Sequence, residues 1–332
     1  MADADPKLAL DERLFERASR LDVFRPFRGC VPWRYEPRKS GPPRAVVSLP
    51  IALNTSHHMA AELIYARVDA AQHIFHWRGR GRDRLARTLA HLMQHFGQHV
   101  LLADVRRCFA SANIDAIAAL DLLPPELIRN ALDHRSLRFR RYGDPIGVEE
   151  TEQTVPQGLL EGSAASNPLA AALFNDLAGH VGKRVVPLMF GDNIAIVAAT
   201  KEACSSAEEN LGRYFADHFA GPFSLTSDYF GPRERFDFLG YSFNPETDGT
   251  VCIHHSTANW AKMMRKLCHE MNLVAFSSPD EALAKLLNGF PALSDEYREN
   301  LLALVTDEFE TAHRMLSGND ATGVGETNDC RQ

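Results

Sequence analysis

Two apolar segments joined by a short polar turn constrain the fold of this chain more than any other feature. Residues 185–190 and 194–198 are almost wholly apolar, and Gly191-Asp192-Asn193 lies between them. Apolar runs of this length around such a turn predict a buried antiparallel β-hairpin. Asp192 would then stand at the end of a buried strand, where a lone carboxylate is costly without a counter-ion.

A second aspartate ends another apolar run. Residues 100–103 read as a buried strand, and Asp104 follows them directly. An aspartate at a strand end and another in a neighbouring hairpin turn can hold two divalent ions about 4 Å apart, the arrangement that nucleotidyl transfer needs. Taken singly, Asp104 could cap a helix and Asp192 could serve only the turn. Taken together, the two aspartates indicate a metal site.

The residues around these aspartates resemble two motifs of reverse transcriptases. Asp104-Val-Arg-Arg-Cys-Phe109 resembles the first palm motif of that family, in which an aromatic residue stands five positions after the aspartate. Phe190-Gly-Asp-Asn193 resembles the third motif, which is usually Tyr-x-Asp-Asp. The two motifs stand in the family's order along the chain.

Residues 158–170, between those two motifs, resemble the second motif of the family. Gly162 and Ser166 stand in the matching positions, and Glu161 stands where the family has glutamine. A competing register starts from Pro156-Gln157-Gly158. It would put Gly162 where the family has serine, so we prefer the first register.

The resemblance covers about residues 40–243. Arg44, in a basic lead into a strand, resembles the fingers arginine that binds the incoming triphosphate. Residues 77–81 resemble the next fingers motif, and residues 238–241 resemble the turn that grips the primer, which implies nucleic-acid contacts for Leu239 and Gly240. An arginine run with little acid beside it favours phosphate contact over a solvated loop. Its members are Arg78, Arg80, Arg82 and Arg84.

The resemblance assigns a role to each matched residue. Asp104, Asp192 and the adjacent Asn193 would form the catalytic set, with Mg²⁺, or Mn²⁺ in its place, bound by the two aspartates. Phe109 would stack under the sugar and exclude a 2′-hydroxyl, with plain core packing as its alternative. Ser166 could likewise be only a small residue that allows close helix packing. The incoming dNTP would be bound by Phe109 and the other matched residues, Arg44, Glu161, Gly162 and Ser166.

Three positions depart from the family pattern. Asn193 replaces the last aspartate of the third motif, Glu161 replaces a glutamine, and Asp228 lies near the place of a common lysine. The loss of one carboxylate lowers the charge of the metal site by one unit. In the family this aspartate is the less directly bound ligand, so both a working enzyme and a degenerate one stay open.

The resemblance implies an α+β fold of the right-hand polymerase type. We expect fingers at residues 1–98, a palm with an antiparallel sheet at 99–245, a small helical thumb at 246–316 and a disordered tail at 317–332. The residues themselves predict further elements from their periodicity. These are helices at 7–21, 57–75, 83–96, 164–177 and 201–219, and an irregular hairpin at 137–154.

The implied reaction is the addition of dNTP to the 3′-hydroxyl of a DNA or RNA primer on an RNA template. The length leaves no room for an RNase H or endonuclease domain, so the chain resembles the small bacterial reverse transcriptases of retroelements and antiviral phage defence. Such proteins often work with a dedicated non-coding RNA or a companion protein. Two rivals remain. One is an RNA-directed RNA polymerase, against which Phe109 argues, and the other is a degenerate palm that serves as a scaffold.

Composition limits the partners and the compartment. A net charge of −7 and a pI of about 6.1 mean that nucleic acid would have to bind at local basic stretches. The six cysteines form no C-x-x-C pair, so the sequence does not predict a zinc knuckle. The histidine pairs at 57–58 and 254–255 lack a third ligand and are expected at the surface. With no signal peptide and no apolar run of about 18 residues, we expect a cytoplasmic protein without a membrane partner.

Overall fold

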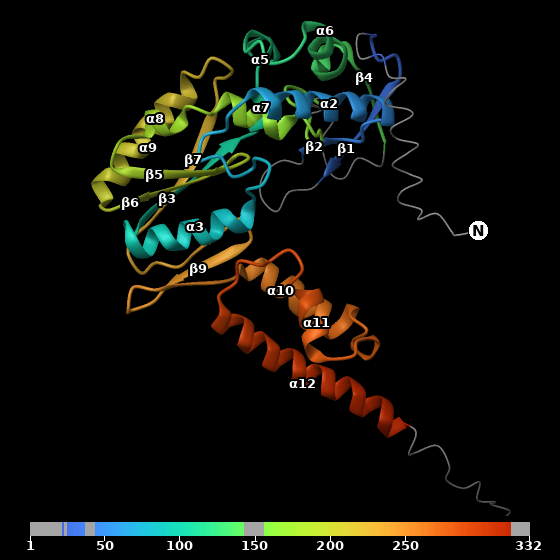
Figure 1. Ribbon diagram of the computed structural model, residues 1–332, viewed down its shortest axis with the longest axis vertical. Helices are drawn as coiled ribbons and strands as arrows, with labels where there is room; N and C mark the ends of the chain where they lie inside the picture. Colours follow the sequence, from blue (N-terminus) through green and yellow to red (C-terminus); the bar gives the residue numbers. More distant parts are fainter. Residues whose placement is uncertain (1–21, 23–24, 37–43, 143–155, 320–332) are drawn as a thin grey trace, which may run out of the picture. The chain divides into compact units, whose positions relative to one another are not determined.

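The computed structural model describes residues 22, 25–36, 44–142 and 156–319 (Figure 1). The chain divides into two compact units. The first combines Met1–Gly81 with Val100–Tyr229, and the second combines Arg82–His99 with Phe230–Gln332. The segment expected to form the fingers therefore contributes to both units, and the boundaries at residues 98 and 245 stay a prediction. The helix expected at residues 7–21 lies outside the described residues.

A four-stranded sheet runs through the first unit, with its strands in the order β5-β6-β3-β7. The strands are β3 (His99–Arg106), β5 (Val185–Phe190), β6 (Asn193–Ala198) and β7 (Ser224–Phe230). The predicted hairpin is confirmed, because β5 and β6 pair antiparallel with Phe190 opposite Asn193. Pro187, which cannot donate to a ladder, is tolerated because β5 is last in the strand order.

Two helices cover the hairpin strands. α8 (Leu177–Val181) and α9 (Lys201–Ala216) pack against β5, and α9 also packs against β6 (Figure 1). α9 begins where the Thr200 hydroxyl accepts a hydrogen bond from the N–H of Ala203. Its buried residues recur every three or four positions and form one apolar face: Cys204, Ala207, Leu211 and Phe215. This cover buries the side chains on one face of β6, a strand whose residues are buried from Ile194 through Ala198.

A smaller sheet of the first unit has the order β2-β1-β4. β1 (Cys30–Glu36) pairs antiparallel with β2 (Arg44–Val47) and parallel with β4 (Arg138–Arg141). Of the hairpin expected at residues 137–154, the described part contains the strand β4, and residues 143–154 lie outside the described residues, so the hairpin stays a prediction. Local sequence could not reveal the parallel pairing of β1 with β4, because parallel strands need a long connection between them.

The helix expected at residues 57–75 is displaced. α2 (Ile51–Arg67) begins directly after Pro50, and the chain beyond it runs beside β5 instead of continuing the helix. There the N–H of Phe75 donates to the carbonyl oxygen of Met189 over 2.8 Å. α2 packs against α7 (Ser166–Leu173), a shorter helix than the one expected at 164–177.

Short helical elements complete the first unit. They are α4 (Cys108–Ser111), α5 (Ile114–Ala119), α6 (Pro125–Leu127), the π-helix η1 (Ile128–Leu132) and the 3₁₀-helix η2 (His134–Ser136). α5 begins with an N-cap, since the Asn113 side chain accepts from the N–H of Asp115 over 2.9 Å.

The second unit contains an antiparallel sheet with the order β10-β9-β8. Its strands are β8 (Phe236–Phe238), β9 (Tyr241–Pro245) and β10 (Val251–His255). Its helical elements are α3 (Arg82–His95), α10 (Thr257–Arg265), η4 (Lys266–Glu270), η5 (Leu273–Ala275), α11 (Pro279–Leu286) and α12 (Asp295–Asn319). α3 and α12 both pack against β10. β10 lies in the segment expected to form a helical thumb. Its side chains are buried at every second residue, which is the period of a strand and not of a helix.

The mixed helices and sheets confirm the α+β class. α12 continues to Asn319, so the expected tail begins later than residue 317, and residues 320–332 lie outside the described part. Among the described residues, none of the helices combines the length and the apolar character needed to cross a bilayer.

Candidate active site

The two predicted carboxylates stand on hydrogen-bonded neighbouring segments of the first unit. The N–H of Val105 donates to the backbone carbonyl oxygen of Asp192 over 2.9 Å, which joins the hairpin turn to the strand residue after Asp104. Burial, and then the charges of Asp192 and Asp104, raise the pKa of the Cys108 thiol. The charges of both carboxylates therefore act on the same buried thiol.

Two side chains hold the turn that carries Asp192. The side-chain amide of Asn193 donates to Oδ1 of Asp192 over 2.8 Å. Nδ1 of His76 accepts from the N–H of Gly191 over 3.0 Å, and burial lowers the pKa of His76 to about 4. Because a neutral imidazole keeps a lone pair for this bond, His76 supports the turn as an acceptor. The sequence offered no signal for His76.

The residues present fit a Mg²⁺ site in which the protein supplies only two ligands. Among the described residues, no group of three or more His, Cys, Asp or Glu side chains could hold a metal ion. Mg²⁺ in nucleotide enzymes is commonly bound by only one or two carboxylates together with substrate phosphates. Asp104 and Asp192 can supply the protein's part of such a site.

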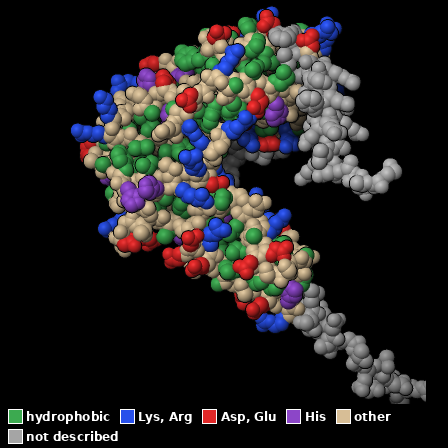
Figure 2. All heavy atoms as spheres, in the orientation of Figure 1, with side chains coloured by type: hydrophobic (Ala, Val, Ile, Leu, Met, Phe, Trp, Pro, Cys, Tyr) green, Lys and Arg blue, Asp and Glu red, His purple; other side chains and the backbone are tan. Residues whose placement is uncertain are grey.

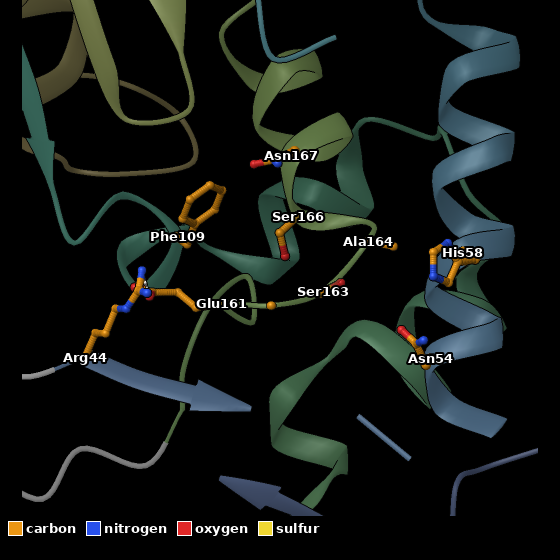
Figure 3. Close-up of a pocket in the computed structure, with 10 residues that line it drawn as sticks. Arg44, Asn54, His58, Phe109, Glu161, Ser163, Ala164, Ser166 and Asn167 are labelled. Carbon is orange, nitrogen blue, oxygen red and sulfur yellow. Dashed lines mark ion pairs between the residues drawn. The ribbon is translucent and has the colours of Figure 1, made fainter. Parts of the chain in front are cut away.

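A pocket of about 570 Å³ opens beside the first motif (Figure 3). All five residues predicted to bind the nucleotide line it: Arg44, Phe109, Glu161, Gly162 and Ser166. They come from β2, α4, the loop before α7 and the start of α7. The structure adds five further lining residues: Asn54, His58, Ser163, Ala164 and Asn167. Figure 3 shows Asn54 and His58 projecting from α2 on the opposite side from Arg44.

Arg44 lies between two carboxylates. One guanidinium nitrogen is 3.0 Å from Oε2 of Glu36, and another is 3.6 Å from Oε2 of Glu161, the ion pair drawn in Figure 3. The N–H of Val47 also donates to the carbonyl oxygen of Glu161 over 3.3 Å. The loop of the second motif is thus joined to β2 by backbone and by charge.

Two glycines let this loop approach its neighbours. Gly158 has φ +60°, and a Cβ there would stand 2.3 Å from the carbonyl oxygen of Phe109. Gly162 has φ +96°, and a Cβ there would stand 3.2 Å from the carbonyl oxygen of Val47. Both positions require glycine. Ser166 is buried, and its hydroxyl donates to the carbonyl oxygen of Leu160 over 2.8 Å, so it supports the loop as well as lining the pocket.

The four predicted phosphate-binding arginines have different surroundings. Arg80 donates to three carbonyl oxygens of one turn, those of Ala70, Ala71 and Ile74. Arg78 pairs with Glu62 and lies over the ring of Tyr65.

The other two arginines belong to the second unit. Arg82 donates to the carbonyl oxygen of Gly289, and Arg84 is exposed. Arg78 and Arg84 are therefore the exposed members of the four. Figure 2 shows Lys and Arg interspersed with Asp and Glu on the displayed face, in line with the acidic net charge.

Leu239 and Gly240 form the turn between β8 and β9. Both have positive φ, +50° and +86°. The carbonyl oxygen of Gly240 accepts from the N–H of Ser256 over 3.0 Å and from the Asn259 amide over 2.9 Å. A Cβ at Gly240 would stand 2.6 Å from that amide nitrogen, so the turn needs glycine for packing.

The expectation that the histidine pairs lie at the surface is wrong for two of the four. His57 is 1% exposed and His255 is 3% exposed. His57 falls on the buried face of α2 with Leu53, Ala60 and Ile64, at helical spacing. That spacing was the signal that could have placed His57 inside.

Comparison with known proteins shows the fold of this chain. No protein-family model and no curated protein sequence matches this chain. Its structure is similar to that of telomerase from Candida albicans, solved in complex with a TWJ fragment of telomeric RNA. The TM-score is 0.51 at 11% identity, over 93% of this chain and 61% of the telomerase chain. This chain therefore spans less than two thirds of that telomerase.

A viral polymerase is similar to the same degree. The Sicinivirus 3Dpol RNA-dependent RNA polymerase gives a TM-score of 0.53 at 9% identity, over 91% of this chain and 67% of the viral one. The chain therefore has a polymerase-like α+β fold.

Proposed function

We propose that the chain is a reverse transcriptase that adds dNTP to a primer 3′-hydroxyl on an RNA template. The observation that carries this proposal is the single pocket lined by Arg44, Phe109 and Glu161, with Gly162 and Ser166 beside them. Three segments distant in sequence supply these side chains, as three separate motifs of one family would. The polymerase-like fold supports the same conclusion.

The chain's own residues have separable tasks in this reaction. Arg44 would meet the negative charge of the triphosphate, and Phe109 would lie against the sugar and exclude a 2′-hydroxyl. Asp104 and Asp192 would hold Mg²⁺, or Mn²⁺, which when bound favours the deprotonated 3′-hydroxyl and neutralises phosphate charge. The 3′-oxygen forms a bond to the α-phosphorus, the bond to pyrophosphate breaks, and the hydroxyl proton passes to solvent.

The proposed setting follows from the resemblance. We place residues 1–98 as fingers, 99–245 as palm and 246–316 as thumb of a small bacterial enzyme of the retroelement or phage-defence type. Its partners would be an RNA template, a DNA or RNA primer, and a dedicated non-coding RNA or companion protein in the cytoplasm. The telomerase that shares the fold was solved with RNA, which supports an RNA partner.

One observation favours a second candidate, a scaffold without catalysis. The Asn193 amide occupies one oxygen of Asp192 and repels a cation, so the site is weaker than one with a third carboxylate. An RNA-directed RNA polymerase is a further alternative, since the viral polymerase is as similar in fold as telomerase. Phe109 in the pocket argues for dNTP.

Primer extension with purified protein, in Mg²⁺ and then Mn²⁺, tests the proposal. Asp104→Asn and Asp192→Asn should abolish extension. Each should also raise the thermal stability of the metal-free protein, because two like charges no longer repel. Asp217→Asn, an exposed carboxylate beyond α9, is the matched control and should extend normally. An Asp104→Asn variant that extends at the wild-type rate would refute the metal site, and a wild type inert with both ions would favour the scaffold.

A further inference from the structure

A buried histidine ties the loop of the second motif to α2. Nδ1 of His57 lies 2.5 Å from the hydroxyl oxygen of Ser163, and Nε2 lies 2.8 Å from the carbonyl oxygen of Ala131. Ser163 stands in the pocket wall between Gly162 and Ser166. His57 itself does not line the pocket, so any influence on a ligand must pass through Ser163.

The hydrogen-bond partners determine the direction of each bond. A carbonyl oxygen only accepts, so Nε2 of His57 must carry the proton that is donated to Ala131. Because burial lowers the pKa of His57 to about 4, the ring is neutral and Nδ1 keeps its lone pair. The Ser163 hydroxyl therefore donates to Nδ1. Its oxygen in turn accepts from the N–H of Ala165 over 3.1 Å.

This chain of bonds leaves the Ser163 hydroxyl a single orientation. Its donor and one acceptor position are both used, and both partners belong to well-packed structure. An imidazole in the apolar face of α2 is costly unless its polar atoms are paired, and here both nitrogens are. A leucine would pack on that face without supporting the loop.

The other end of the loop is held in a similar way. The N–H of Leu159 donates to the carbonyl oxygen of Phe109 over 2.8 Å. Glu161 and Gly162 lie between these two anchor points. Their positions in the pocket therefore depend on both ends being held.

We propose that His57 is a positioning residue for the incoming nucleotide, acting through Ser163 to hold the pocket wall formed by Glu161, Gly162 and Ser166. This inference rests on the proposed function, because it takes the pocket to be the nucleotide site. His57 touches no substrate in this scheme. Its contribution is to keep the pocket wall at one distance from Arg44 and Phe109.

Four variants test the proposal. His57→Leu and Ser163→Ala each remove the bond, and each should raise the KM for dNTP about tenfold while changing kcat less, since a displaced binding wall costs ground-state affinity. His57→Asn keeps an acceptor near the position of Nδ1 and should retain a KM within about threefold of wild type. The double variant of His57→Leu and Ser163→Ala should be no worse than the worse single variant, because both remove one interaction.

A matched control separates positioning from general destabilisation. His218 is also a buried histidine, with Nε2 3.1 Å from the carbonyl oxygen of Leu173, and it does not line this pocket. His218→Leu should lose stability with an unchanged KM for dNTP. An unchanged KM in His57→Leu, or an equal rise in His218→Leu, would overturn the positioning role.

Amide hydrogen exchange provides a readout that does not need catalysis. Residues 158–166 should exchange faster in His57→Leu and Ser163→Ala than in wild type, and not in His218→Leu. Unchanged exchange in the first two variants overturns the inference whatever the activity. A wild type that adds no nucleotide overturns the proposed function instead, and the exchange rates then decide alone whether His57 holds the loop.

Discussion

The side-chain amide of Asn193 donates a hydrogen bond to Oδ1 of Asp192 over 2.8 Å. An aspartate at this position, as the resemblance would have it, could not donate and would add a second negative charge beside Asp192. The replacement therefore removes a possible ligand and also engages the ligand that remains.

Asn193→Asp should change the metal preference without creating activity from nothing. Mn²⁺ accepts mixed ligands more readily than Mg²⁺, so the wild type should work better in Mn²⁺. The variant should need less Mg²⁺ for half-maximal extension, by about tenfold, the usual effect of a residue beside a metal ligand. Metal titrations of primer extension measure this. Identical titration curves would mean that residue 193 does not act on the metal.

Phe109→Val should admit rNTP. The ring lines the pocket, and its removal takes away the surface that a 2′-hydroxyl would strike. The ratio of kcat/KM for dNTP to that for rNTP should fall about tenfold or more, a change typical of one steric contact. Phe109→Tyr keeps the ring and is the control. If the ratio stays constant in Phe109→Val, Phe109 serves packing alone.

Arg44 and Glu161 should have opposite effects on dNTP affinity. Arg44→Ala removes a positive charge and should raise the KM for dNTP about tenfold with little change in RNA affinity. Glu161→Gln removes the carboxylate 3.6 Å from Arg44 and should lower that KM, because the guanidinium is then less neutralised. Arg44→Ala should keep nearly wild-type stability, since ion pairs of a half-exposed guanidinium contribute little. A rise in KM for Glu161→Gln would show that the carboxylate itself contacts the nucleotide.

Arg80→Ala should mainly lower stability, whereas Arg84→Ala should mainly weaken RNA binding. Arg80→Ala removes the guanidinium donor from three carbonyl oxygens, of which that of Ala71 keeps the N–H of Ile74, and should cost about 2 kcal/mol or more of unfolding free energy. Arg84→Ala should change stability by less than about 0.5 kcal/mol. It should reduce the salt dependence of RNA binding by about one unit of slope if Arg84 contacts a phosphate. Denaturant titrations and RNA binding at several salt concentrations distinguish the two.

Stability should fall in mildly acidic solution because of buried histidines. The pKa values of His57 and His76 are lowered from 6.5 to about 4 in the folded protein. Between these values the unfolded chain binds more protons, so their contribution is complete above pH 6.5 and is lost as the pH falls toward 4. Each histidine contributes up to about 1.4 kcal/mol per pH unit. Unfolding measured from pH 7 to 4.5 should therefore show a shallower decline for His76→Leu than for wild type.

The sequence alone was sufficient for features that depend on local pattern. The apolar runs on either side of Gly191 predicted the β5–β6 hairpin, because strand pairing across a tight turn needs no distant partner. The resemblance to reverse transcriptase motifs implied which side chains would bind one nucleotide and so share a pocket. Five of them line it, although nothing in their local sequence shows that they meet.

Only the tertiary structure decided which polar groups are used within the protein. Arg80 looked like a phosphate ligand by its charge, yet its guanidinium binds the turn at residues 70–74. His57 looked like a surface residue, yet it bonds Ser163 across 106 positions of the chain. Hydrogen bonds between distant segments leave no periodic trace in sequence, because they depend on how the backbone folds back and not on neighbouring residues. Local pattern therefore determined the hairpin and the motifs, and long-range packing determined which charged and polar side chains remain available to a substrate.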